Sequence, residues 1–183
     1  LADVIATTDA GVGWTRTFSS RVYLDLLRGV FQRLAQKVPF KLRVIGNFDY
    51  ELPGVDLEVV RWSAAAEVAQ LQALDIGVYP LPIDDWVLGK SGLKAIQYMA
   101  FALPCIATEV GTTPMLIRHG ENGLLVRTEA EWETALEALI GGLVHGQIDA
   151  WEAWPEGYAT PNRRIMYAAL NWCQEHHTEI VDI

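Results

Sequence analysis

Strand-like and helix-like segments alternate between residues 11 and 141 of this chain, and this order restricts the fold more than any other feature. Apolar strand-like runs are predicted at 11–14, 41–46, 57–62, 76–79, 105–107 and 124–126. Strands that are apolar on both faces and alternate with helices are typical of a parallel sheet covered on each side, with right-handed crossovers. The sequence therefore predicts an α/β fold with a doubly wound, Rossmann-like parallel sheet.

Four segments place apolar residues at helical spacing. They are 20–37 with Leu24, Leu27, Phe31 and Leu34; the segment after Ser63 with Ala64, Val68, Leu71 and Leu74; 92–102 with Leu93, Ile96, Ala100 and Leu103; and the segment after Thr128 with Trp132, Ala135, Leu136 and Leu139. Thr128 and Glu131 have the spacing of a capping box, which predicts a helix start at this point. Helices and strands therefore account for most of residues 11–141.

Length and composition indicate one domain over residues 1–183, with its core at 11–141. The chain has 183 residues, of which 51% are hydrophobic, enough for a sizeable core. Residues 142–160 lack a clear period and predict an irregular connection, and 161–181 predict a terminal helix. Residues 1–10 do not have the pattern of a secretory signal, so we expect the chain to begin inside a larger protein.

Charge and cysteine usage exclude several classes of protein. The net charge of −9 argues against general nucleic-acid binding, which needs clustered cations. The two cysteines have neither disulfide-framework nor metal-type spacing, so we expect a reducing, cytoplasmic setting. No apolar run reaches the roughly 20 residues of a membrane-spanning helix. A small anionic ligand stays possible if a few cations are placed locally.

Two loops at predicted carboxyl ends of strands combine glycine, hydroxyl and cationic groups, as anion sites do. In 13–17, Gly13 permits close approach of the backbone, Thr15 offers a hydroxyl and Arg16 can pair with phosphate oxygens. The alternative is an ordinary helix entry with a surface arginine. The second loop, 89–94, brings two glycines and two lysines to a helix start.

Lys90, Lys94 and Gln97 are spaced i, i+4 and i+7 and are predicted to share a helix face. The alternative for this face is an ordinary solvated side. Neither loop has the P-loop or dinucleotide fingerprint, so the residues alone indicate a site for a phosphorylated small molecule. Trp62, at a strand end, offers a ring on which a base could stack, although it could equally pack or lie on the surface.

No metal site is predicted. Asp84 and Asp85 could suggest one, but a solvated loop is the favoured interpretation. His119 lies in a polar turn, and His176 and His177 face different directions of a helix, so surface or structural roles are favoured for all three.

Residues 88–126 carry motifs that resemble the C-terminal domain of family-4 (group 1), GT-B-fold glycosyltransferases. The matching positions are Met99, Ala100, Pro104, Val110, Gly111, Pro114, Gly120, Asn122, Gly123 and Leu124. With the earlier strand, helix and strand, the resemblance covers roughly residues 11–140. It implies a domain that binds a nucleoside-diphosphate sugar as donor substrate, with no further cofactor. It also implies transfer with retention of anomeric configuration to an acceptor held by a separate N-terminal domain, which we expect to be absent from this chain.

The resemblance also implies roles for single residues. Arg16 and Lys90 would neutralise the diphosphate leaving group, and the amides of Gly92 and Leu93 would hold its oxygens. Together with Gly13, Thr15, Trp62 and Lys94, these residues form the predicted site. Gln97 stands where the family has the second glutamate of its Glu, seven residues, Glu pattern, and its amide oxygen can accept from ribose hydroxyls.

Two departures keep other functions open. Gly89 stands at the pattern's first glutamate, and Met115 replaces the glutamate that follows the proline of the family motif. One alternative is a non-catalytic nucleotide-binding module degenerate from the family, and another is a nucleotide-sugar epimerase or hydrolase. We expect the isolated chain to bind donor or nucleotide weakly and to transfer nothing.

Overall fold

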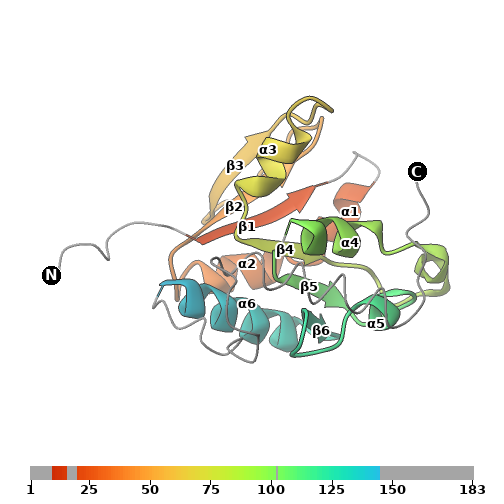
Figure 1. Cartoon of the computed structure of the whole chain (residues 1–183). Helices are drawn as coiled ribbons and strands as arrows, with labels where there is room; N and C mark the ends of the chain where they lie inside the picture. The colour runs from red at the N-terminus through yellow and green to blue at the C-terminus, as the bar shows by residue number, and fades with distance from the viewer. Residues whose placement is uncertain (1–9, 16–19, 102, 145–183) are drawn as a thin grey trace, which may run out of the picture.

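A computed structural model describes residues 10–15, 20–101 and 103–144, and its centre is a six-stranded sheet in the order β3-β2-β1-β4-β5-β6 (Figure 1). The strands are β1 (Ala10–Thr15), β2 (Phe40–Ile45), β3 (Asp56–Val60), β4 (Ile76–Tyr79), β5 (Cys105–Thr108) and β6 (Leu124–Val126). All five strand pairs are parallel. The predicted doubly wound α/β fold is confirmed, with strands within two residues of the predicted ones.

Helices cover both faces of this sheet. α1 (Arg21–Asp25), α2 (Arg28–Leu34) and α6 (Glu129–Val144) pack on one face, where α2 contacts α6 (Figure 1). α3 (Glu67–Gln72) and α4 (Leu93–Ala100) cover the other face. Right-handed crossovers require this division, because the connections before and after β3 run in opposite directions across the sheet.

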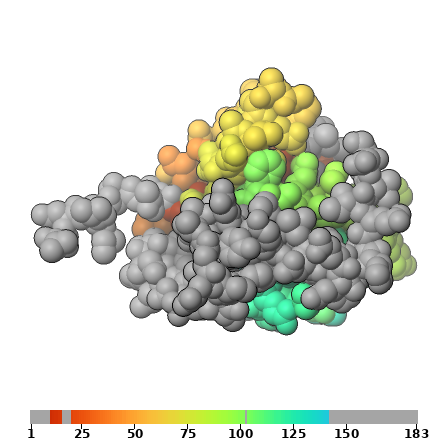
Figure 2. Space-filling view, in the orientation of Figure 1, coloured from red at the N-terminus to blue at the C-terminus, as the bar shows by residue number. Residues whose placement is uncertain are grey.

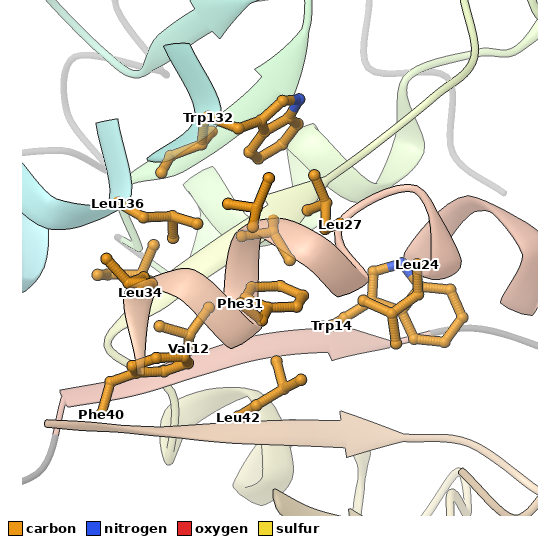
Figure 3. Close-up of a cluster of buried hydrophobic side chains, with 14 of the residues drawn as sticks. Val12, Trp14, Leu24, Leu27, Phe31, Leu34, Phe40, Leu42, Trp132 and Leu136 are labelled. Atoms are coloured by element: carbon orange, nitrogen blue, oxygen red, sulfur yellow. The ribbon is translucent and has the colours of Figure 1, made fainter. Parts of the chain in front are cut away.

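The core beneath α2 and α6 buries the predicted apolar stripes of both helices. Figure 3 shows Leu34, Phe31 and Leu27 between the sheet and α6, whose Trp132 and Leu136 point toward them. Trp14 of β1 meets Phe48 edge-on, with 6.0 Å between ring centroids. Ion pairs also join the two helices. Glu133 of α6 pairs with Arg33 of α2 at 2.7 Å and with Lys37, just after α2, at 2.8 Å.

Two predicted helices have different limits in the structure. The helix expected over 20–37 is divided at Leu26 and Leu27, so that Leu24 and Leu27 both enter the core. The helix expected after Ser63 begins at Glu67 instead, and its Val68 is exposed rather than buried.

The buried face of α4 also differs from the predicted stripe. Leu93 is 42% exposed and Ala100 is exposed, whereas Ala95, Tyr98 and Met99 are buried, and Lys94 with them. The reason is that the sheet presents Gly77 below this helix, and the Tyr98 ring occupies the space that a side chain at Gly77 would fill.

The connection between β2 and β3 contains no helix, although the two strands are parallel. Parallel strands normally need a longer, helical crossover. Here the loop at 46–55 covers the sheet by itself, because it buries Phe48, Tyr50 and Leu52. Two short helices, the 3-10 helix η2 (Asp85–Gly89) and α5 (Thr113–Leu116), were not predicted.

The remaining predictions on organisation are tested only in part. α6 extends to Val144, three residues into the segment predicted as an irregular connection. The rest of that connection, the terminal helix at 161–181, Cys173, His176 and His177 lie outside the described residues. Cys105 lies fully buried in β5, where burial raises the pKa of its thiol. Within the described ranges, the helices are all too short or too polar to cross a membrane.

Candidate functional site at the carboxyl edge between β1 and β4

The strand order reverses between β1 and β4, and ligands of doubly wound sheets bind in the crevice at the carboxyl ends of such strands. Gly13 of β1 and Gly77 of β4 are partners across this junction. A Cβ atom at Gly13 would meet Leu74 at 2.2 Å, and one at Gly77 would meet the Tyr98 ring at 2.3 Å. Both positions therefore need glycine so that Leu74, just after α3, and Tyr98 of α4 can lie close to the sheet.

Tyr98 joins the ends of the two strands. Its hydroxyl accepts the N–H of Thr15 at 3.3 Å and donates to the carbonyl of Val78 at 3.4 Å. Thr15 is itself buried, and its amide donates to Tyr98 at the carboxyl end of β1. Sequence reasoning did not single out Tyr98. The sequence contains one indication of its role, which is an aromatic residue on a helix that lies opposite a glycine in a strand.

The loops that follow β4 and β5 are tied to each other. Thr108 accepts the N–H of Leu81 at 2.9 Å, and the Thr112 hydroxyl donates to the Lys90 carbonyl at 2.7 Å. Gly111 has φ 60°, and a Cβ there would lie 3.1 Å from the Val87 carbonyl oxygen. These contacts fix the backbone that leads into α4.

Asp84 has a structural role in this loop. Its carboxylate accepts the N–H of Val87 at 3.2 Å and so caps η2. Asp84 and Asp85 are exposed, and the described part of the chain holds no group of three metal-binding side chains. The prediction of a solvated loop at these aspartates agrees with this arrangement.

Lys90 lies in the segment that connects β4 to α4, close to α1. Its ammonium stands 5.0 Å from the centroid of the Tyr23 ring, which belongs to α1, and the side chain is half-buried. Among the described residues it has no ion pair, whereas the arginines of α1 and α2 all pair with carboxylates. This leaves a positive charge, oriented by an aromatic ring, at the mouth of the crevice.

Gly92 forms the turn that starts α4. It has φ 72°, and a Cβ there would approach Leu116 to 2.3 Å. Leu93 is the first residue of the helix, and the first N–H groups of a helix have no intrahelical acceptor. These free donors and the positive end of the helix dipole favour an anion near Gly92 and Leu93.

Lys94, Gln97 and Glu67 form a polar chain that links α4 to α3. The Lys94 ammonium donates to Gln97 Oε1 at 2.6 Å, and Gln97 Nε2 faces Glu67 Oε1 at 3.5 Å. Lys94 is only 9% exposed, so the alternative of a solvated face is wrong for this residue. The predicted i, i+4, i+7 face is also incorrect at Lys90, because that residue is extended and precedes the helix.

The remaining predicted site residues, Trp62 and Arg16, and the two positions that depart from the family pattern, Gly89 and Met115, are placed as follows. Trp62 follows the carboxyl end of β3 and is 39% exposed. Met115 of α5 is 66% exposed. A Cβ at Gly89 would meet no atom within 4 Å, so this position has space for a larger side chain. Arg16 lies outside the described residues.

A polar depression beside α1 was missed by the sequence reasoning. It is lined by Arg21, Asp25, Arg28, Asp49 and Glu51. Both arginines pair with Asp25 and flank the Tyr50 ring, whose hydroxyl donates to Asp25 at 3.1 Å. Burial of this ring, with the nearby Asp25 carboxylate, raises the pKa of Tyr50 to about 12. The arginine charges here are compensated within the protein.

The Gly-x-Asn-Gly turn of the sequence motif has a structural role. Asn122 is buried, accepts the N–H of Arg118 at 2.7 Å and donates to the Leu116 carbonyl at 3.2 Å. His119 Nδ1 lies 3.1 Å from the Leu125 amide nitrogen, which agrees with the structural role favoured for it. A side chain at Gly123 would collide with the Cys105 carbonyl oxygen at 2.7 Å.

Sequence comparisons agree with these observations. The model of the family described as "Glycosyl transferases group 1" matches residues 12–141. A D-inositol 3-phosphate glycosyltransferase of Rhodococcus erythropolis is 35% identical over 95 residues, which are 44% of this chain and 21% of the relative. One from Pseudarthrobacter chlorophenolicus is 31% identical over 118 residues, 63% of this chain and 27% of the relative. The chain thus spans well under half the length of these curated relatives.

Solved structures share the fold. The C-terminal domain of a glycosyl transferase group 1 family protein from Francisella tularensis superposes with a TM-score of 0.57 at 19% identity, covering 93% of this chain and 87% of that chain. An Anabaena protein in complex with UDP and glucose gives a TM-score of 0.61 at 16% identity, covering 92% of this chain and 47% of that one.

Proposed function

Because this chain belongs to the group 1 glycosyl transferases, we propose that it is the donor-binding domain of such an enzyme. It holds a nucleoside-diphosphate sugar at the carboxyl edge of the sheet, between β1 and β4. In the full-length protein, the sugar passes with retention of configuration to an acceptor bound by an N-terminal domain.

The observation that carries this proposal is the position of Lys90. Its ammonium reaches from the β4–α4 loop to the Tyr23 ring of α1, so it stands across the crevice at the strand-order reversal. The start of α4 at Gly92 and Leu93 lies two residues further along the same loop. A cation and free helix N–H groups at one position suit a diphosphate better than a neutral ligand.

This arrangement also explains how the domain would assist transfer. When the bond between the sugar and the diphosphate breaks, negative charge develops on the diphosphate oxygens. Fixed donors at Leu93 and a cation at Lys90 stabilise that charge more strongly than they stabilise the intact donor, which lowers the barrier. Arg16, which follows β1 in the sequence, supplies a second cation in this proposal.

One set of observations supports a second candidate, a nucleotide-binding module without transferase activity. Gly89, Met115 and Gln97 all lack the carboxylate that the family pattern places there. Met115 has a thioether and Gly89 has no side chain, so neither side chain offers a carboxylate to a donor sugar. Nucleotide affinity would survive these replacements, because the diphosphate contacts do not involve them.

The test of donor binding is calorimetric titration of the chain with UDP, GDP and ADP. We expect one of the three to bind saturably, and Lys90→Ala to weaken it about tenfold or more, since a charge-assisted hydrogen bond contributes roughly 1.5–3 kcal/mol. Lys41→Ala is the matched control and should leave affinity unchanged, because Lys41 is a half-buried lysine of β2 that pairs with Asp56. Equal binding by wild type and Lys90→Ala would contradict the proposed site.

Turnover of a nucleotide sugar by the full-length protein distinguishes the two candidates. Transfer to an acceptor supports the enzyme. Binding without turnover supports the module. Conversion of the donor in the absence of any acceptor would instead indicate an epimerase or hydrolase.

A further inference from the structure

Gln97 is held between two charged groups of opposite sign. Its Oε1 accepts from the Lys94 ammonium at 2.6 Å, and its Nε2 faces the Glu67 carboxylate at 3.5 Å. The reverse orientation would place its amide hydrogens against an ammonium and its oxygen against a carboxylate. The two neighbours therefore orient this amide, and both of its polar ends are directed at protein groups.

Glu67 brings a carboxylate to the crevice from a different element. It is the first residue of α3, which follows the carboxyl end of β3, and it is half-buried. α3 and α4 adjoin on the same face of the molecule, as their surfaces show in Figure 2. In the described part of the chain, Gln97 is the group that approaches one of its oxygens, and the second oxygen is left to other donors.

We infer that Glu67, rather than Gln97, is the carboxylate that accepts hydrogen bonds from the ribose hydroxyls of the bound nucleotide. This inference rests on the function proposed above. A vicinal diol offers two O–H donors, and a carboxylate offers two acceptor oxygens with a full negative charge, which makes stronger bonds than an amide.

The same contacts explain why position 97 is an amide in this chain. A glutamate there would place a second carboxylate about 3.5 Å from Glu67, and like charges at this separation repel. Gln97 instead bridges the buried Lys94 to Glu67, so that the carboxylate of this chain of contacts is on α3 and not on α4. Gln97 is thus a positioning residue for Glu67 and Lys94.

The test compares ribonucleotides with their 2′-deoxy forms. UDP and dUDP, GDP and dGDP, and ADP and dADP are titrated into the wild-type chain and into Glu67→Gln, which preserves the shape of the side chain and removes its charge. Glu121→Gln is the matched control, because Glu121 is an exposed glutamate at the opposite edge of the sheet, paired with Arg118. Thermal unfolding of each variant verifies that it is folded.

The expected result is that wild type binds the ribonucleotide roughly tenfold more tightly than the deoxynucleotide, as one lost bond to a charged acceptor predicts. Glu67→Gln should reduce this ratio to about two, chiefly by weakening the ribonucleotide, and Glu121→Gln should retain it. An unchanged ratio in folded Glu67→Gln, or no preference in wild type, would overturn the role of Glu67 and leave donor binding intact. Absence of binding of all three ribonucleotides by wild type would refute the proposed function, and this inference with it.

Discussion

Replacing Gly77 with alanine should strongly destabilise the fold, because the new methyl group would occupy the space of the Tyr98 ring. The added Cβ would lie 2.3, 2.5 and 2.7 Å from three ring carbons. Carbon atoms in contact are about 3.5–4.0 Å apart, so the ring must move by roughly 1 Å. It cannot turn toward solvent, because it is fully buried and its hydroxyl is bound between Thr15 and Val78.

The expected magnitude follows from these contacts. Overpacking of a filled core costs about 1–3 kcal/mol, and loss of the Tyr98 hydroxyl bonds adds about 1 kcal/mol. Alanine gains back roughly 0.5–1 kcal/mol over glycine in backbone entropy. We therefore expect a net loss of roughly 1–3.5 kcal/mol for Gly77→Ala. Gly141→Ala is the matched control with the opposite sign, because that glycine lies in α6 and its Cβ would meet no atom within 4 Å. It should stabilise by roughly 0.5–1 kcal/mol.

The assay is unfolding in urea followed by circular dichroism, with the slope required to stay constant between variants. A double-mutant cycle with Tyr98→Ala identifies the source of the loss, because removal of the ring should make Gly77→Ala nearly neutral. If Gly77→Ala were within about 0.5 kcal/mol of wild type, the close packing of α4 on β4 would be refuted. Additive effects in the cycle would show that the loss does not come from the ring.

Three further predictions concern single residues. Asn122→Ala should destabilise by about 2–3 kcal/mol in urea, since the hydrogen bonds to the partly buried Arg118 N–H and to the buried Leu116 carbonyl are lost. A loss below about 0.5 kcal/mol would contradict the role of this turn. Hydrogen bonds from the Arg127 and Thr128 amides lower the pKa of Glu131. The ionised Glu131 therefore stabilises the fold above the ordinary glutamate pKa of about 4.3, and this stabilisation is lost as pH falls through the lowered pKa. The stability of Glu131→Gln should therefore fall less steeply than that of wild type when thermal unfolding is followed at decreasing pH, and parallel curves would refute this. Gly89→Glu should leave the melting temperature unchanged, because its Cβ meets open space. In calorimetry it should raise the affinity for a nucleotide sugar about fivefold relative to the affinity for the nucleotide. A marked loss of stability would show that the position is not open.

The sequence by itself determined the features that depend on local order. Alternating apolar runs predicted six strands and the doubly wound class, and the structure has both. The capping box at Thr128 and Glu131 was predicted and its reciprocal bonds are present at 3.0 and 3.2 Å. Such features are predictable because a strand, a cap or a turn requires particular residues at nearby positions in the chain.

Only the tertiary structure decided which residues meet at the site. Periodicity assigned Leu93 to the buried face of α4. In the structure the Tyr98 ring fills the space above Gly77, and Lys94 is buried on the same helix instead of Leu93. The helix spacing of Lys90 and Gln97 suggested neighbours, yet Lys90 reaches Tyr23 of α1 and Gln97 faces Glu67 of α3. The physical reason is that the order of strands brings loops from distant parts of the chain to one edge, and a side chain's burial depends on what packs against it there.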